Sequence, residues 1–251
     1  MKSMLAAAAL AVVLGLGQGQ TRQEFDVAVV RPVDVSKLGN AISINIGSVR
    51  HEEVTFGNVT LNDCIRFAYR IGSDVQIEGP NWIKSNQSQF RYDIVAKGAP
   101  GTSREQLQDM MQTLLDERFM LKVHREQKEM SYYALVLDKN GPKIRFVTDV
   151  PEGFRGTTFG GRINSILQMP MLSYLLSRFE TGRPIIDETG LRGMYEVKLE
   201  WAPSQQQNAD TSSAPSLFTA VSEQLGLKLE GRKGPVEILV VDSAEKVPTD
   251  N

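Results

Sequence analysis

Two stretches in different halves of the chain share one alternation of apolar and polar side chains. They are RYDIVAKG, residues 91–98, and MYEVKLEW, residues 194–201. Successive side chains of a strand point to opposite faces, so Tyr92 and Tyr195 each begin an apolar face and an acidic residue begins the polar face. Such a recurrence requires the chain to build similar strands twice. We therefore expect an internal duplication to govern the fold.

The elements around these strands recur in the same order. Apolar spacing and capping residues predict helices at TLNDCIRFAYRI, SREQLQDMMQTLLDERF, the segment around Leu172 and Leu175, and SLFTAVSEQLG. Strands are predicted at EFDVAVVRP, VTFGNV, VQIEG, RYDIVAKG, FMLKVHRE and YYALVLD, and then at RINSIL, RPIID, MYEVKLEW, LKLEG and VEILVVD. The predicted fold class is α+β, with two similar β-α-β-β-α-β-β halves whose small mixed sheets are each covered by two helices.

The predicted domain organisation follows from changes in composition along the chain. Residues 1–20 form a signal peptide, 21–145 the first α+β half with its N-terminal strand, 146–161 a connection, and 162–248 the second α+β half. The polar stretch at 202–214 is predicted to be a mobile loop within the second half.

The N-terminal stretch has the parts of a secretory signal. Lys2 gives a positive n-region, and an apolar run from Met4 to Leu16 is followed by small residues. The run is too short for a stable bilayer span. We expect cleavage and a periplasmic or extracellular location in a bacterium, with no stable membrane span afterwards. The alternative is an uncleaved N-terminal anchor.

Charge and glycine patterns bear on partners and cofactors. The chain has 28 Lys and Arg against 30 Asp and Glu, a formal net charge of −2, which leaves no electrostatic footprint for nucleic acid or an anionic membrane. The glycine-rich GTTFGGR, residues 156–162, lacks the G-K-S/T signature and the strand and helix that a phosphate cradle needs. We expect no nucleic-acid partner and no cofactor.

Cysteine and histidine offer little for catalysis or metal binding. Cys64 is the one cysteine, so no intramolecular disulfide can form. It shares a helical face with Leu61 and Ile65, which predicts a buried core thiol rather than a nucleophile. HEEV, which begins at His51, has no second histidine at zincin spacing, and His124 is predicted to be solvated or to face an edge. No metal site is expected.

Acidic residues remain as candidates for hydrolytic chemistry, namely Asp93, Asp187, Glu188, Glu196 and Glu200. A glycosidase would need two of them to converge in a cleft, with one kept protonated. We interpret Asp187 and Glu188 as turn residues, and Asp93 and Glu196 as strand charges whose length differs between the two stretches. Trp82 and Trp201 are predicted to cover core rather than to stack on a sugar. No catalytic residue is assigned.

Several blocks are specific enough for comparison with known families. They include FDVAVVRP, NVTLNDCIRFAY, GPNWI, RYDIVAK, YALVLDKNGPK, GRPIIDETGLRGMYEVKLEW and EKVP. From about residue 25 to residue 248 the chain resembles the large paralogous family of secreted soil-acidobacterial proteins of unknown function. A similar domain in that family is sometimes fused to a BlaR-type membrane metallopeptidase, which implies extracytoplasmic sensing. The topology is also similar to the short N-terminal domains of secretins and TonB-dependent receptors, which implies no function.

These observations favour a secreted, non-enzymatic binding or protein-interaction module. Its sheet edges could accept a strand from an unknown peptide or protein partner. One alternative is an extracytoplasmic ligand sensor that acts with a membrane partner. The other is a hydrolase with an unrecognised carboxylate site, which predicts a deep cleft lined by convergent acidic groups.

Overall fold

The computed structural model describes most of the chain, namely residues 23–35, 45–84, 89–149, 151, 154, 156–159, 161–178, 182–203 and 214–249. The predicted signal peptide at 1–20 and most of the predicted loop at 202–214 lie outside the described residues. Among the helices that are described, none has the length and apolar character needed to cross a membrane.

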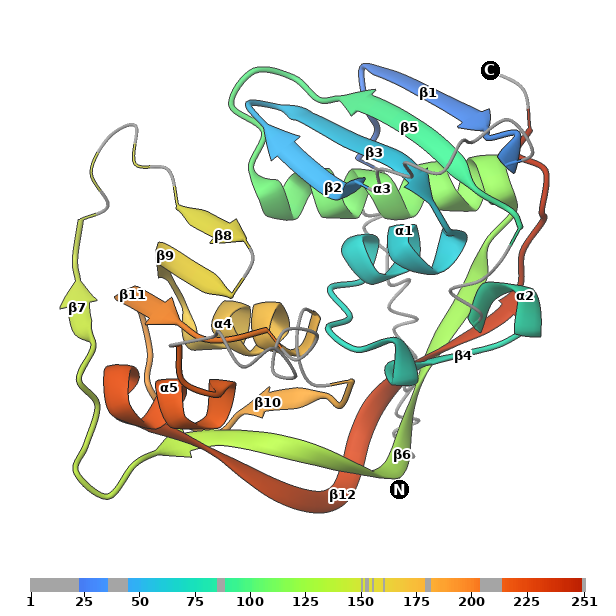
Figure 1. Ribbon diagram of the computed structural model, residues 1–251. Coiled ribbons are helices and arrows are strands. Elements are labelled where there is room, and N and C mark those ends of the chain that lie inside the picture. Colours follow the sequence, from blue (N-terminus) through green and yellow to red (C-terminus); the bar gives the residue numbers. More distant parts are fainter. Residues whose placement is uncertain are drawn as a thin grey trace, which may run out of the picture.

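Three sheets make up the β structure (Figure 1). The first has the order β1 (Val27–Pro32), β5 (Tyr92–Lys97), β3 (Glu53–Val59), β2 (Asn45–Arg50). The second has the order β7 (Arg145–Val147), β11 (Met194–Glu200), β9 (Arg162–Leu167), β8 (Thr157–Phe159). The third has the order β10 (Ile185–Asp187), β6 (Lys122–Leu137), β12 (Leu227–Ser243), β4 (Ile77–Glu78).

Helices cover the first two sheets and form a layer with each. The first layer contains the first sheet with α1 (Leu61–Ala68) and α3 (Arg104–Phe119), and the second layer contains the second sheet with α4 (Met169–Leu176) and α5 (Leu217–Leu225) (Figure 1). The short elements η2 (Asp74–Gln76) and α2 (Asn81–Lys84) flank β4. The predicted α+β fold class is confirmed.

Local capping explains where the helices begin and end. Ser103 Oγ accepts a hydrogen bond from the backbone N–H of Gln106, and the Gln106 side chain accepts one from the Ser103 N–H, as a capping box requires. Gly226 ends α5 in the left-handed region at φ 63°. These caps confirm the helix boundaries that the sequence predicts at both positions.

The third sheet differs from the prediction. Most of FMLKVHRE and YYALVLD lies in the single strand β6, and LKLEG and VEILVVD lie in the single strand β12. Phe119, predicted to begin a strand, is the last residue of α3. Pro235 does not interrupt β12, because it pairs with Glu129 where β12 has one described neighbour, a position at which a sheet tolerates proline. The two long strands are antiparallel and pass both layers (Figure 1).

The halves of the chain exchange strands in this third sheet. β4, from the first half, pairs in parallel with β12, and β10, from the second half, pairs in parallel with β6. The strand pairs of the first and second sheets are antiparallel. The sequence predicts a mixed sheet in each half. Among the described strands, parallel and antiparallel pairs instead occur together in the sheet that the two halves share.

The order of elements corresponds between the two halves. β2-β3-α1-β4-β5-α3-β6 is followed by β8-β9-α4-β10-β11-α5-β12, and β1 and β7 occupy equivalent places in their sheets. The internal duplication itself stays a prediction, because element order does not demonstrate common origin. β2, β7 and β8 were not predicted, and the stretch 146–161, expected to be a connection, contains β8 and most of β7.

Each layer has its own hydrophobic core. In the first, Tyr92, Ile94 and Ala96 of β5 are buried with α1, α3 and the end of β12. In the second, β9, β11, α4 and α5 pack with the start of β12. Because Asp93 and Lys97 on the opposite face of β5 are exposed, the predicted alternation is confirmed.

Candidate functional site

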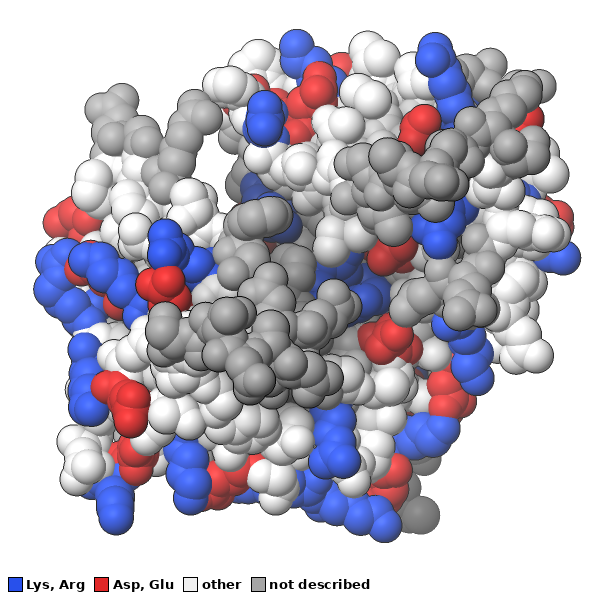
Figure 2. Space-filling view, in the orientation of Figure 1, with Lys and Arg blue, Asp and Glu red and all other residues white. Residues whose placement is uncertain are grey.

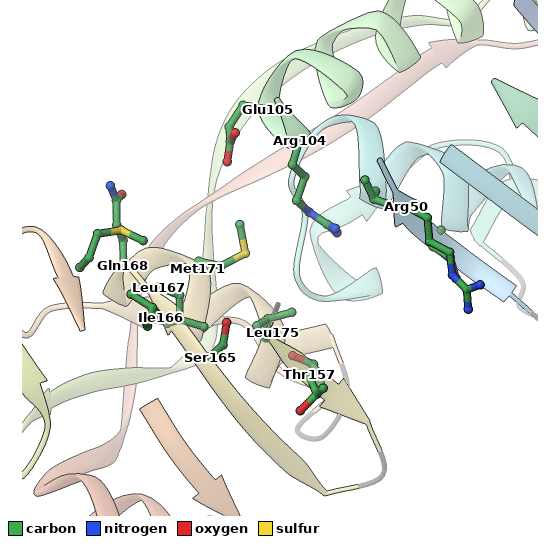
Figure 3. A pocket seen from close by; sticks show the side chains of 16 residues that line it. Arg50, Arg104, Glu105, Thr157, Ser165, Ile166, Leu167, Gln168, Met171 and Leu175 are labelled. Atoms are coloured by element: carbon green, nitrogen blue, oxygen red, sulfur yellow. The ribbon is translucent and has the colours of Figure 1, made fainter. Parts of the chain in front are cut away.

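A cleft with a volume of about 920 Å³ lies between the two layers (Figure 3). The first layer contributes residues 47–50 of β2 and Arg104 and Glu105 at the start of α3. The second layer contributes residues 156–158 and 165–168, followed by Met171, Leu175 and Met194. This volume is in the range of sites that hold small organic ligands.

Close packing positions the first wall of the cleft. Gly47, at φ 108°, would place a Cβ 2.9 Å from Cε1 of Phe56 and 3.1 Å from Cδ2 of Phe67, so β2 passes the two rings where a side chain would not fit. The rings meet edge to face with centroids 5.3 Å apart. Asn45 Oδ1 accepts a hydrogen bond of 3.1 Å from the Ser48 N–H, which stabilises the bulge in β2.

Arg104 extends from this wall into the cleft. Its guanidinium carbon lies 5.3 Å from the ring centroid of Phe67, a cation–π arrangement. In Figure 3 the side chain runs from α3 toward Met171 and Leu175 of the second layer. Burial lowers the pKa of Arg104, with a smaller contribution from the charge of Arg178, while Tyr174 and Glu105 act in the opposite direction. Within the described part of the chain Arg104 has no ion-pair partner.

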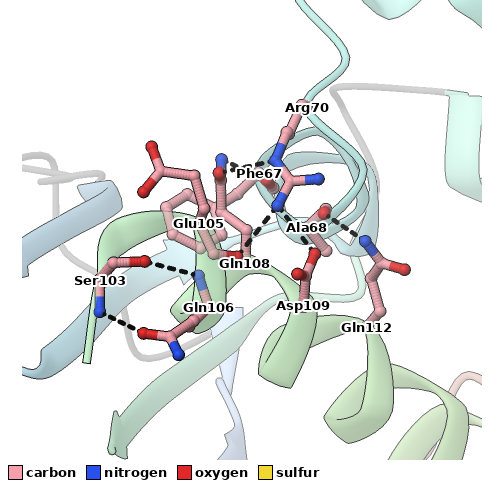
Figure 4. A network of polar contacts seen from close by, with 9 residues as sticks. All are labelled: Phe67, Ala68, Arg70, Ser103, Glu105, Gln106, Gln108, Asp109 and Gln112. Carbon is pink, nitrogen blue, oxygen red and sulfur yellow. Dashed lines mark hydrogen bonds and ion pairs between the residues drawn. The ribbon is translucent and has the colours of Figure 1, made fainter. Parts of the chain in front are cut away.

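A network between α1 and α3 fixes the position of Arg104 (Figure 4). Arg70, just after α1, donates hydrogen bonds to Gln108 Oε1 at 3.0 Å, to the Glu105 carbonyl at 3.0 Å and to Asp109 Oδ1 at 2.8 Å. Gln108 Nε2 in turn donates to the Phe67 carbonyl at 3.0 Å. The last carbonyls of α1 are thereby satisfied by α3 side chains, and the first turn of α3 is held beside the cleft.

Two further arginines lie behind the cleft. Arg66 of α1 is nine-tenths buried and donates to the Gly72 carbonyl, while Arg178 donates to the Ile46 carbonyl at 3.1 Å. Burial lowers the pKa of Arg66, and the nearby charge of Arg178 adds to the effect. Arg66 Nε and Arg178 Nη1 are buried donors with no described acceptor. Neither arginine lines the cleft, and the carboxylates of Asp74 and Asp63 offset part of the Arg66 charge.

The second wall carries an apolar surface on and beside α4, together with the polar side chains of Thr157, Thr158, Ser165 and Gln168. Leu167 of β9 is buried, and Met171, Leu175 and Met194 are half-buried beside it. Ser165 directs its hydroxyl into the same space (Figure 3). Methionine side chains adapt their shape to a bound apolar group. In the cleft, Arg104 on the first wall thus faces the apolar side chains of α4 on the second.

The acidic candidates from the sequence do not converge, and none of them lines the cleft. Glu196 pairs with Arg145, its cross-strand neighbour, at 2.7 Å, which confirms a strand charge pair. Its pKa is lowered by hydrogen bonds from Lys198 and Arg145. Asp93 differs from the expectation of a merely solvated charge, because it accepts a 2.8 Å hydrogen bond from the Asn58 N–H.

The other acidic candidates also have structural partners. Asp187 accepts hydrogen bonds from the Thr189 N–H at 3.0 Å and its hydroxyl at 2.7 Å, which confirms the predicted turn. Glu188 pairs with Arg232, and Glu200 pairs with Arg162.

Cys64 and the tryptophans are placed largely as the sequence predicts. Cys64 is fully buried, and burial raises the pKa of its thiol. Trp201 is buried in the second core, and Trp82 packs edge-on against Phe90 at 5.8 Å.

His124 is exposed, as predicted, and lies between two carboxylates. Its Nδ1 is 3.0 Å from Asp242 Oδ2 and its Nε2 is 2.8 Å from Glu126 Oε1. No group of three or more His, Cys, Asp or Glu residues suited to a metal ion occurs among the residues that the structure describes.

Arg104 and the strands β2 and β8 were not predicted from the sequence. One signal was present, since an arginine at the first position of a helix opposes the helix dipole and is unfavourable unless it serves another purpose. The glycine-rich stretch at 156–162, which lacks a nucleotide-binding signature, supplies residues 156–158 of the cleft wall. Only the fold brings these distant segments together.

Comparison with known proteins identifies a protein family. The chain matches no curated protein and no solved structure. One family pattern matches residues 62–244, which include all of α1 except its first residue, the shared third sheet and most of the residues that line the cleft. The resemblance to a family of unknown function is confirmed to that extent. The chain belongs to the family described as "Protein of unknown function (DUF3738)".

Proposed function

We propose that the protein is a secreted, non-enzymatic binding module whose ligand occupies the cleft between the two layers. The observation that supports this most directly is a volume of about 920 Å³ walled by residues from both halves of the chain. Binding clefts of this kind are concave and mostly apolar, with a few placed polar groups. The N-terminal sequence supports a location outside the cytoplasm.

The sensor alternative is favoured by one feature of the fold. A ligand in the cleft would contact both layers, which are joined by the long strands β6 and β12. Occupancy could therefore change how the layers are held, as a sensor with a membrane partner requires. The hydrolase alternative has less support, because Glu105 is the one carboxylate among the described lining residues.

A thermal-shift screen of small organic compounds tests the proposal. A compound present at 100 times its Kd should raise the melting temperature by about 5–10 °C. The variant Thr157→Trp places a large ring at an exposed position on the cleft wall, where an aromatic residue suits a strand. Thr148→Trp, exposed and outside the cleft lining, is the matched control.

The expected result is a set of compounds that stabilise the wild type and Thr148→Trp but not Thr157→Trp. Compounds that stabilise all three proteins equally would bind elsewhere and would contradict the proposed site. Turnover of a screened compound would overturn the non-enzymatic assignment.

A further inference from the structure

We infer that the ligand of this cleft is a small amphipathic organic acid, whose carboxylate pairs with Arg104 and whose apolar body lies on α4. The inference rests on the proposed function, because it names the class of compound that the same cleft would take. Its basis is the position of Arg104, which faces the apolar side chains of Met171 and Leu175 across a single space.

Arg104 differs from several other arginines of this fold in that it forms no ion pair among the described residues. Arg70, Arg145, Arg162 and Arg232 each pair with a carboxylate. Arg104 is partly buried and lines the cleft; within the described residues its guanidinium lies over the Phe67 ring and forms no ion pair, while the nearby Glu105 carboxylate offsets its charge only in part. A partly desolvated guanidinium without a directly paired anion is costly, and a bound carboxylate would reduce that cost through two parallel hydrogen bonds.

The surroundings of Arg104 add to the positive potential. Arg104 is the first residue of the sixteen-residue helix α3, whose N-terminal dipole favours an anion. Arg178 lies close enough to influence the pKa values of both Arg66 and Arg104. The buried Arg66 Nε and Arg178 Nη1 are donors that the described residues leave unused.

Figure 2 shows blue side chains in the hollow between the upper right part and the left part of the molecule. Glu105 is the acidic member of the lining, against Arg50 and Arg104. In Figure 3 Arg104 extends toward the apolar side chains and Arg50 points away from them, so one negative charge on the ligand would suit the cleft.

The opposite wall indicates the rest of the ligand. Met171 and Leu175 of α4 face Arg104 across the cleft, and Leu167 and Met194 extend this apolar surface (Figure 3). Each methylene group that leaves water strengthens binding. An inorganic anion would leave this wall in water, and a neutral hydrocarbon would leave Arg104 unpaired. An acid with an apolar chain satisfies both walls.

The test uses three probes of equal chain length, octanoate, octan-1-ol and octylamine, with binding measured by calorimetry. We expect octanoate to bind at least tenfold more tightly than octan-1-ol and octylamine, as a charge-assisted pair requires. Arg104→Gln should weaken octanoate at least tenfold and leave octan-1-ol within twofold. Arg104→Lys should retain part of the octanoate affinity, since it keeps the charge but loses the planar fork.

A control variant and the possible negative results distinguish the proposed binding site from the proposed ligand class. Arg31→Gln, exposed on β1 at the far edge of the first sheet, should bind octanoate as the wild type does. If all three probes bind equally and Thr157→Trp abolishes their binding, the cleft is a binding site but the acid inference is wrong. If octanoate binds and neither Thr157→Trp nor Arg104→Gln weakens it, both proposals are overturned. If octanoate does not bind, the acid inference falls, and the compound screen decides the proposed function.

Discussion

Arg178 joins the two layers through a hydrogen bond from its Nη2 to the carbonyl oxygen of Ile46, at 3.1 Å. Arg178 follows α4 in the second layer, and Ile46 belongs to β2 in the first. The next residue along β2, Gly47, lines the cleft. This contact therefore helps to fix the position of one wall of the cleft relative to the other.

Replacing Arg178 should loosen this connection. In Arg178→Met the Ile46 carbonyl loses a charged donor, and we expect the free energy of unfolding to fall by about 1–3 kcal/mol. Amide hydrogen exchange in β2 should also become faster, because the strand loses its link to the second layer. Urea denaturation and exchange measured by mass spectrometry check both effects.

A matched control is Arg192→Met, at an exposed arginine before β11. Its unfolding free energy should stay within about 0.5 kcal/mol of the wild type. Equal stability and equal β2 exchange in the two variants would contradict the role assigned to Arg178.

A side chain at Gly226 should destabilise the protein more than its positive φ alone would, because neighbouring backbone atoms lie close to the Cβ position. A Cβ there would collide with the carbonyl oxygen of Gly141 and lie 2.8 Å from the Lys143 nitrogen. Gly190 has a similar φ of 70° with nothing within 4 Å of its Cβ position. We expect Gly190→Ala to cost about 1–2 kcal/mol from backbone strain. Gly226→Ala should cost about 1–3 kcal/mol more from overpacking. Equal losses by urea denaturation would show that the Gly141 contact is unimportant.

Local patterns in the sequence predicted local structure well. The capping box at Ser103, the glycine end at Gly226 and the alternation in β5 depend on residues close together in the chain. The continuity of β6 was missed because its central residues are polar and largely exposed on both faces, a composition that also suits a loop. In the fold this segment is held by its ladder with β12, from the other half of the chain.

The cleft could not be predicted for a similar reason. Arg104, β2 and β8 lie in three separate parts of the sequence, and none carries a catalytic motif. What brings them together is the exchange of β4 and β10 within the third sheet, a long-range pairing that leaves no local signature. The acidic residues on strands were noticed in the sequence because polar and apolar side chains alternate regularly along a strand.

Cys64 should react with thiol reagents only after the protein opens. Its side chain is fully buried, and burial raises the pKa of the thiol, so the native protein presents almost no thiolate to a reagent at about pH 8. We expect labelling to be slow in buffer and to accelerate with urea in parallel with global unfolding. Mass spectrometry after iodoacetamide treatment measures the rate. Native-state labelling at the rate of a free thiol would contradict the buried position.

His124 should make stability depend on pH. Hydrogen bonds to Asp242 and Glu126 raise its pKa above the usual 6.5. The folded protein therefore holds the proton more tightly than the unfolded chain, so this contribution is complete below about pH 6.5 and is lost as pH rises through the folded-state pKa. Urea denaturation should show a larger stability difference between wild type and His124→Gln at about pH 5.5 than at about pH 9. Asp242→Asn should lower the His124 pKa measured by NMR, and a pH-independent difference would refute this linkage.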